Sequence, residues 1–358
     1  MKIVKYILIG TGILIALLLG ARAVFSVQIG EALFRSAVKA NLGQSALADA
    51  PDGLSAILVG TGSPLPDPGR VGPMTVVAAG DRIFIIDAGS GSARRFGELR
   101  LPWGNVEAVF LTHFHSDHID GLGEVMLQHW AAGGAKTPLA LHGPNGVERI
   151  AAGFTHAYAQ DTTYRIAHHG AEVISPSGQG AEAVAFTPSG RPEIVYEKDG
   201  LTVSAVSVDH SPIEPAVAYR FDYRGRSVTI SGDTVKDDRL VTLANDTDLL
   251  IHEALNADMV SVVRDELSAN GETRLAAIMN DILDYHTTPV EAAEVAHAAN
   301  VRMLALSHIV PAQPSRLLYP AYLKGTAKAY DGPIIMGEDG MMFTLPAGSD
   351  KIERRRLN

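Results

Sequence analysis

Seven consecutive residues, Thr112–His118 (THFHSDH), carry three histidines and an aspartate, and they place the tightest limit on how this chain can fold. They directly follow Val106–Leu111 (VEAVFL), an apolar run that predicts a buried strand. A strand that ends in such side chains delivers them to the rim of a sheet, where a site can form. Neutral imidazole and carboxylate are the ligand types that Zn²⁺ and similar divalent ions favour. The segment therefore predicts a metal site at a sheet edge rather than a solvated histidine-rich turn.

Three more polar residues follow apolar runs later in the chain, and they are candidates for the distant ligands of such a site. These are His210 after Leu201–Val208, Asp233 after Ser227–Ser231, and His308 after Met303–Ser307. Within the first segment, alternate side chains of an extended chain point to the same side, so His113 and His115 can grip one ion together. Asp117 and His118 lie beyond a turn and can serve a second ion.

Composition limits the class of protein. The chain has 358 residues, a hydrophobic fraction of 46% and a charged fraction of 20%, which suits one large α/β domain or two small ones. It contains no cysteine, so disulfides and thiolate ligands are excluded and any metal is held by His, Asp or Glu. The formal net charge of −10 argues weakly against a polyanionic partner, because nucleic-acid binders usually have a basic face.

The N-terminus has the parts of an export signal. Lys2 and Lys5 precede the uncharged apolar run Tyr6–Gly20, and Ala21-Arg22-Ala23 follows. The run is also nearly long enough to be an uncleaved membrane anchor. We expect residues 1–25 to be a signal peptide or signal anchor. In a bacterium the rest of the protein would then be periplasmic or held at the outer face of the cytoplasmic membrane.

After this segment, residues 26–50 have helical spacing and predict a connector. From Leu54 onward, short apolar runs punctuated by Gly and Pro predict many strands and few helices. The predicted strands are 56–60, 74–79, 83–87, 106–111, 139–142, 201–208, 216–221, 227–231, 248–252, 303–307 and 341–345. The clearest predicted helices are 123–132 and 289–300, the second with a Thr288 cap and Glu291 completing a capping box. Residues 143–199 are expected to be loop-rich and to contain an insertion that faces the substrate.

The order of these motifs, HxHxDH, then His, then Gly-Asp-Thr, then a His after a strand, resembles that of the metallo-β-lactamase superfamily of binuclear metallohydrolases. The resemblance extends from Leu54 to the C-terminus. It implies a four-layer αββα sandwich, an α/β (α+β) fold, in a hydrolase domain over residues 51–348 with a charged tail at 349–358. It also implies that His113, His115 and His210 bind one metal, that Asp117, His118 and His308 bind the other, and that Asp233 bridges them. Asp87 matches a residue that orients ligands, although it could be an ordinary strand-end aspartate.

The chemistry implied is hydrolysis without a side-chain nucleophile. Two divalent ions, Zn²⁺ by default with Mn²⁺ or Fe²⁺ as alternatives, would lower the pKa of a bound water so that a metal-bound hydroxide attacks. A non-catalytic scaffold is disfavoured, because a dead site has no physical need for all seven ligand positions.

Two further motifs resemble those of the ribonuclease Z and arylsulfatase-like branch. His252-Glu253-Ala254 and Tyr285-His286-Thr287 match its His-Glu-Ala-Thr and His-Ser-Thr motifs, with Leu255 in place of the first Thr. The match implies that His286 is a general acid for the departing oxygen and that Glu253 orients it, so both join Asp117 in the predicted catalytic set. The other interpretations are a helix-terminal histidine with a local hydrogen bond and a core-capping glutamate.

The resemblance has one gap. Transfer-RNA-processing ribonuclease Z has a long Gly/Pro-rich arm between the third-motif His and Gly-Asp-Thr, whereas His210 and Asp233 are here separated by a single hairpin's length of chain. With the acidic balance and the export signal, this favours a small anionic phosphodiester or sulfate ester as substrate and argues against nucleic acid. A transfer-RNA 3′-end endonuclease and a lactone or amide hydrolase stay open as alternatives, and a homodimer is possible.

Overall fold

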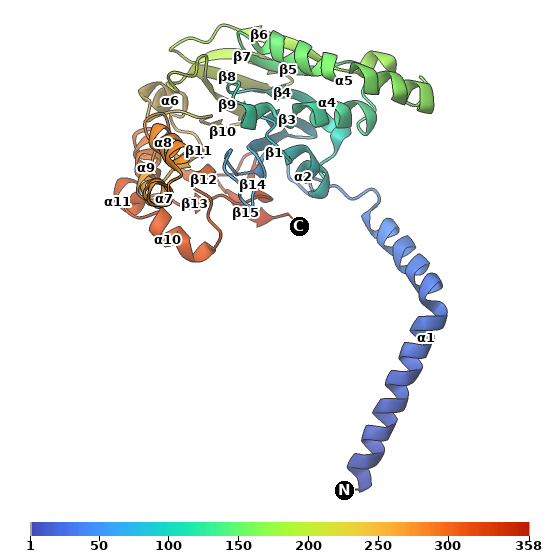
Figure 1. The fold of residues 1–358 in the computed structure, drawn as a ribbon. Coiled ribbons are helices and arrows are strands. Elements are labelled where there is room, and N and C mark those ends of the chain that lie inside the picture. The colour runs from blue at the N-terminus through green and yellow to red at the C-terminus, as the bar shows by residue number, and fades with distance from the viewer. Residues whose placement is uncertain (1, 358) are drawn as a thin grey trace. The chain divides into compact units, whose positions relative to one another are not determined.

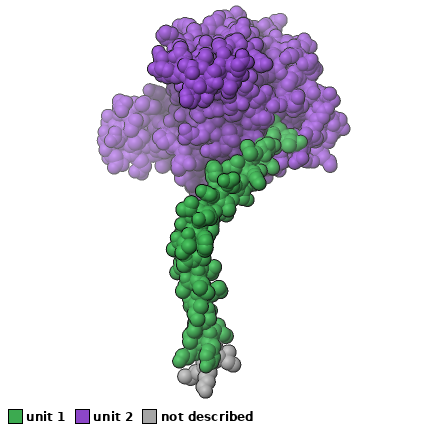
Figure 2. Space-filling model, turned by 90° about the vertical axis from the view of Figure 1, so that its right-hand side faces the viewer, with its two compact units in different colours: residues 1–48 green, residues 49–358 purple. Residues whose placement is uncertain are grey.

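The computed structural model describes residues 2–357 of the chain; Met1 and Asn358, the outer ends of the expected N-terminal segment and C-terminal tail, lie outside them. The chain divides into two compact units, Met1–Ala48 and Asp49–Asn358 (Figure 2). Each unit is described by itself.

The first unit is dominated by one helix, α1 (Lys2–Asn41). The backbone leaves helical geometry at Phe25 (φ −110°, ψ 16°), the last residue of the expected signal or anchor. The stretch Val4–Ala40 is long and apolar enough to cross a membrane, although a signal sequence would have the same length and composition. The choice between a cleaved signal and a retained anchor therefore stays a prediction.

The second unit is built on two β-sheets (Figure 1). The eight-stranded sheet has the order β15-β14-β1-β2-β3-β4-β5-β6 and the seven-stranded sheet the order β13-β12-β11-β10-β9-β8-β7. The strands are β1 (Gly53–Gly60), β2 (Met74–Ala79), β3 (Arg82–Ile86), β4 (Val106–Phe110), β5 (Leu139–Pro144), β6 (Ala181–Phe186), β7 (Glu193–Lys198), β8 (Leu201–Ser207), β9 (Val217–Tyr223), β10 (Arg226–Ile230), β11 (Leu249–Leu255), β12 (Met303–Val310), β13 (Ile334–Met336), β14 (Met341–Pro346) and β15 (Glu353–Arg356).

Helices cover the outer faces of both sheets. The larger sheet carries α2 (Ser92–Glu98), α4 (Leu122–Ala131) and α5 (Val147–His169), and the smaller carries α6 (Asp238–Leu243) and α9 (Pro289–Ala298). The remaining helices are α3 (Ser116–Ile119), α7 (Ala257–Ala269), α8 (Thr273–Asp281), α10 (Tyr319–Tyr322) and α11 (Thr326–Ala329). The predicted four-layer αββα sandwich is thus confirmed.

Two apolar layers hold the sandwich together. Between the sheets, Phe84, Phe110 and Phe221 are fully buried in one cluster with aliphatic residues of both sheets. On the outer face of the smaller sheet, buried alanines of α9, such as Ala292 and Ala296, allow the helix to approach β11 and β12 closely. The capping box at Thr288 and Glu291 fixes the start of α9, as the sequence predicts.

Strand direction explains where a site can form. β3, β4 and β5 are parallel neighbours, and so are β10, β11, β12 and β13. β8 and β10 both pair antiparallel with β9, so β8 runs in the same direction as β10. The carboxyl ends of these strands meet at one edge of the sandwich, which is where ligands bind in open α/β sheets.

The prediction that residues 143–199 are loop-rich is wrong, because they form α5, β6 and β7. The 23-residue α5 buries only Val147, Ala151 and Thr162, so it has no apolar stripe that sequence periodicity could detect. The charged residues 349–358 are also partly ordered, since β15 pairs with β14 at the edge of the larger sheet.

Candidate active site

All seven predicted metal ligands lie together at the edge where the parallel strands end. Their ligand atoms form two neighbouring groups, each of which could hold one ion: His113, His115, His210 and Asp233 in the first, and Asp117, His118 and His308 in the second. All of these side chains are buried except that of His115, which is half-buried. Residues up to 195 positions apart in the chain therefore meet because the strands that precede them end side by side.

The first group has three imidazoles around one point. His115 Nδ1 lies 3.1 Å from His113 Nε2 and 3.4 Å from His210 Nε2. Burial lowers the pKa of each of these three histidines, that of His113 well below its ordinary value. They are therefore neutral at physiological pH, and neutral imidazole is the form that binds a metal.

In the second group, a carboxylate and two imidazoles converge. His308 Nε2 lies 3.2 Å from Asp117 Oδ2, and His118 Nε2 lies 3.5 Å from the same oxygen. Asp117 and His118 come from α3, the short helix after the β4 strand, whereas His308 comes from β12 with a positive φ of 46°. That left-handed backbone turns the side chain out of the strand's normal alternation.

Asp233 lies between the two groups. Its Oδ2 is 3.3 Å from His118 Nε2, 3.4 Å from His308 Nε2, 3.8 Å from His113 Nε2 and 3.9 Å from His210 Nε2. Burial alone would raise the pKa of Asp233, but the surrounding imidazoles, His308 first, hold it well below its ordinary value. A carboxylate that is ionised and faces both groups can bridge two ions.

The residues present fit a pair of divalent metal ions. His118 donates its Nδ1 hydrogen to Asp87 (2.8 Å), so its Nε2 carries the lone pair whenever the ring is neutral. That Nε2 is buried and has no hydrogen-bond partner within residues 2–357, which is costly unless a metal or a water satisfies it. His210 is arranged similarly, because its Nδ1 donates to the Tyr285 carbonyl (2.9 Å) and its Nε2 faces the cluster.

Asp87 holds the cluster from behind, as the resemblance implies. Its Oδ1 accepts from the Thr112 backbone N–H and its Oδ2 from the Thr112 hydroxyl and His118 Nδ1, all at 2.8 Å. The residue has a positive φ of 59°. One buried carboxylate thus fixes both the start of the histidine segment and the ring of one candidate ligand.

Glu253 and His286 form a second device beside the cluster. Glu253 Oε1 accepts from His286 Nδ1 (2.9 Å) and from the backbone N–H groups of Thr287 (3.1 Å) and Thr234 (3.2 Å). Burial alone would lower the pKa of His286, but the charge of Glu253 and its hydrogen bond raise that pKa to about 9. The pair matches the orientation expected from the sequence, with a protonated imidazole beside the candidate ligands.

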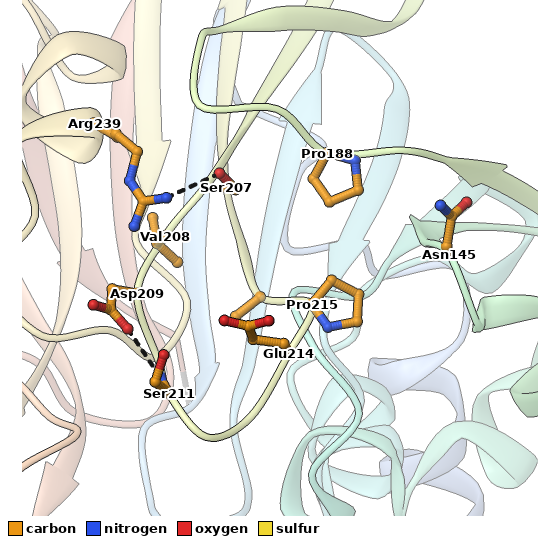
Figure 3. A pocket seen from close by; sticks show the side chains of 10 residues that line it. Asn145, Pro188, Ser207, Val208, Asp209, Ser211, Glu214, Pro215 and Arg239 are labelled. Carbon is orange, nitrogen blue, oxygen red and sulfur yellow. Dashed lines mark hydrogen bonds between the residues drawn. The ribbon is translucent and has the colours of Figure 1, made fainter.

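An open pocket of about 690 Å³ adjoins this edge (Figure 3). Asp209 and Ser211, the neighbours of His210, line one part of it, and Arg239 and Asn145 lie on opposite sides in the view. Arg239 donates to Ser207 (3.2 Å) and to Asp237, which fixes its guanidinium at the wall. The pocket therefore lies beside the segment of chain that carries His210.

Sequence reasoning missed contributions from the backbone. The Tyr285 carbonyl orients His210, and the Thr234 and Thr287 amides orient Glu253. Every residue has the same main-chain groups, so the sequence does not mark which of them make such contacts. The one available signal was that Thr234, Tyr285 and Thr287 are next to Asp233 or His286 in the sequence.

Paired imidazole–carboxylate groups at the edge of an αββα sandwich define a metal-dependent hydrolase. The family model described as the metallo-beta-lactamase superfamily matches residues 67–272. A ribonuclease Z of Mycobacterium bovis strain BCG is 36% identical over 261 residues, which cover 72% of this chain and 87% of the relative. The chain therefore belongs to the metallo-β-lactamase superfamily and, within it, to the ribonuclease Z branch.

Solved structures share the fold. Human tRNase Z, short form, has a TM-score of 0.58 at 21% identity and covers 82% of this chain and 99% of its own. The metallo-β-lactamase fold protein YhfI of Bacillus subtilis has a TM-score of 0.58 at 20% identity, with 81% of this chain and 99% of its own covered.

The expectation of a small anionic ester as partner, with nucleic acid unlikely, is contradicted by the curated relatives, which are named ribonuclease Z; the transfer-RNA endonuclease kept open as an alternative agrees better with them. Two steps of the reasoning fail. The net charge of −10 describes the whole chain, whereas nucleic-acid binding depends on the local charge of one surface. The short β9–β10 hairpin shows that no arm lies at that place, but it does not show that RNA has no other surface to bind.

Proposed function

We propose that this protein is an RNA endonuclease of the ribonuclease Z type, which hydrolyses a phosphodiester bond near the 3′ end of a transfer-RNA precursor. The observation that carries the proposal is the Glu253–His286 pair beside the two ligand groups, in a chain that is 36% identical to a ribonuclease Z over 261 residues.

In this proposal His113, His115 and His210 would hold one ion, Asp117, His118 and His308 would hold a second, and Asp233 lies between the two groups. When bound, two divalent ions, Zn²⁺ by default, would supply Lewis-acid activation of water and neutralise charge on the phosphate. The seven side chains hold this centre, and Asp87 fixes the orientation of the His118 ring.

His286 has the role of a proton donor. Breaking a phosphodiester leaves an alkoxide oxygen, which departs more readily if it takes up a proton in the transition state. The His286 Nδ1 hydrogen is committed to Glu253, so the proton that can be transferred is on Nε2. Glu253 keeps that proton available by stabilising the imidazolium.

The localisation also remains part of the proposal. The apolar α1 would direct the chain to a membrane, either as a signal removed later or as an anchor. The hydrolase unit would then work outside the cytoplasm, so the proposed RNA substrate would have to reach it there.

The test uses the full chain, loaded with Zn²⁺ and purified in detergent. A transfer-RNA precursor with a 3′ trailer should be cut at one position, and the Asp233→Ala protein should not cut it. Bis-p-nitrophenyl phosphate serves as a substrate that needs no RNA recognition. If a protein with about two bound ions hydrolyses this ester but leaves every RNA precursor intact, the ribonuclease proposal is wrong.

A further inference from the structure

The C-terminal strand concentrates positive charge in an otherwise acidic protein. Arg354, Arg355 and Arg356 are consecutive on β15, and together with Arg316 they line an open groove of about 520 Å³. β13, β14 and α10 supply the rest of its lining, including Met336, Met341 and Tyr319. We call this surface the arginine groove; its elements lie near one another in Figure 1.

Strand register shows how the groove forms. Arg356 pairs with Met341 and Arg354 with Phe343, and Phe343 belongs to the core between the two sheets. Directly opposite residues in an antiparallel pair share a face, so Arg354 and Arg356 lie on the face that looks toward the smaller sheet. That sheet ends there at β13. The groove is therefore the open side of the sandwich, between the edge strands of the two sheets.

The groove keeps a net positive charge. Glu338 is the one carboxylate in its lining, and it pairs with both Arg316 and Arg356 (2.6 Å to the latter) and accepts from the Tyr319 hydroxyl (3.0 Å). One carboxylate cannot neutralise the three guanidiniums of Arg316, Arg354 and Arg356, so its effect is to fix the orientation of two of them. Arg354 is exposed and has no ion pair within the described residues 2–357.

The groove begins at the catalytic edge. β13 runs parallel to β12, which carries His308, and Met336 at its end pairs with Leu306. Arg70 connects the two regions, since it donates to the Gly337 carbonyl (2.6 Å), to Tyr319 (3.1 Å) and to the Thr61 hydroxyl. The Thr61 carbonyl in turn accepts from the backbone N–H of Ile309, the residue after His308.

We propose that the arginine groove binds the phosphate backbone of the RNA substrate at a distance from the cut; this rests on the function proposed above. Arginine forks match phosphate oxygens bidentately, and fixed forks lose less entropy on binding. A groove that starts at the catalytic edge lies on the path of a strand whose scissile bond is in the active site. This surface compensates for the arm that the β9–β10 hairpin lacks. An anionic lipid surface is the other polyanion a chain with α1 could meet, but a flat bilayer fits a concave groove poorly.

The test measures binding of a fluorescently labelled transfer-RNA precursor to the full chain in detergent, in an Asp233→Ala background that prevents cutting. Arg354→Gln on one wall and Arg316→Gln on the other are the test variants. Lys136→Gln is the matched control, because Lys136 is an exposed cation just before β5, at the opposite end of the sheet from the site. Each test variant should weaken binding about fivefold and lower the slope of log affinity against log salt by about one, and the control should do neither.

Several outcomes separate the possibilities. Equal losses in the test variants and in Lys136→Gln would indicate a general charge effect and overturn the groove. If the test variants bind RNA normally but bind phosphatidylglycerol vesicles more weakly than the wild type does, with phosphatidylcholine vesicles as the reference, the groove binds the membrane and the proposal is overturned. If wild-type protein cuts the precursor while Arg354→Gln binds it normally, the groove is wrong and the ribonuclease function stands. If the protein binds RNA through these arginines but never cuts it, the groove stands and the ribonuclease function is wrong.

Discussion

Replacing Glu253 by Gln tests the chemistry of the site with little change of shape. Gln is nearly isosteric, and its carbonyl oxygen can still accept from His286 Nδ1 and from the Thr234 and Thr287 amides, so the ring should stay in place. What changes is the charge. Burial lowers the pKa of His286, and the charge of Glu253 is the first of the effects that raise it to about 9.

The size of the effect follows from that pKa. With a pKa of about 9, roughly 90% of His286 is protonated at pH 8; at an ordinary value of about 6.5, only about 3% is protonated. Without the carboxylate charge, burial acts with less opposition and the pKa falls toward its ordinary value, with Asp233 still acting to raise it. A step that needs a proton from His286 should therefore slow about 30-fold at pH 8.

The assay is the pH dependence of single-turnover RNA cleavage by Zn²⁺-loaded protein. In the wild type, the rate should fall as pH rises through about 9, because His286 then loses its proton; in Glu253→Gln that fall should move to lower pH, toward the ordinary histidine value of about 6.5. Hydrolysis of bis-p-nitrophenyl phosphate should change much less, since p-nitrophenolate leaves without protonation, and His286→Ala should show the same contrast. Equal losses on both substrates, or an unshifted alkaline limb, would refute general-acid duty.

Four further outcomes are expected. Chelation of the metals should lower the thermal unfolding midpoint in calorimetry, because an ion held about 1,000-fold above its dissociation constant stabilises the fold by roughly 4 kcal/mol; an unchanged midpoint would contradict metal binding. Asp87→Ala should weaken metal affinity about 10–100-fold in a competition titration, and unchanged affinity would show that Asp87 does not support His118. Burial lowers the pKa of His142 to about 4, so as pH falls below about 6.5 the unfolded chain binds a proton that the folded chain does not, and the folded state loses stability. In urea unfolding, the wild type should therefore lose about 2.5 kcal/mol more stability between pH 7 and pH 4.5 than His142→Phe does. Equal losses in the two proteins would contradict this. A chain without residues 1–48 should leave the membrane fraction and keep its hydrolase activity; continued membrane association would show that another surface binds the bilayer.

The candidate site could be predicted because its signals are local. His113–His118 is contiguous, and His210, Asp233 and His308 each follow an apolar run. Each run predicts a strand from its own residues, whichever strands it pairs with. The strand order and the fact that these ends share one edge depend on pairing between distant segments, and only the resemblance to a family supplied them.

What the sequence missed has a common physical cause. α5 is mostly solvent-exposed and β15 is a run of charges, so neither shows the apolar periodicity on which prediction relies. β15 is stabilised by pairing with β14, and the residues of β15 alone do not predict this contact. The same strand carries arginines that the overall charge of −10 conceals, which shows that the net charge of a chain does not give the charge of one of its surfaces.

The four buried carboxylates at this edge, Asp233, Asp117, Asp87 and Glu253, have different roles because each has different neighbours. Asp233 faces four imidazoles of both ligand groups, whereas Asp117 lies beside His118 and His308 of the second group only, so both are placed to contact metals. Asp87 is saturated by Thr112 and His118 and can only orient them. Glu253 Oε1 accepts from two backbone amides and from His286 Nδ1, and its negative charge keeps the His286 ring protonated. A buried carboxylate is stable only when its donors satisfy it, so moving any of these charges would strand the donors it leaves. Hydrogen bonding and burial therefore decide which of these carboxylates binds metal, which orients a ligand and which holds a proton on His286. The residue type alone does not decide it, because all of them are carboxylic acids.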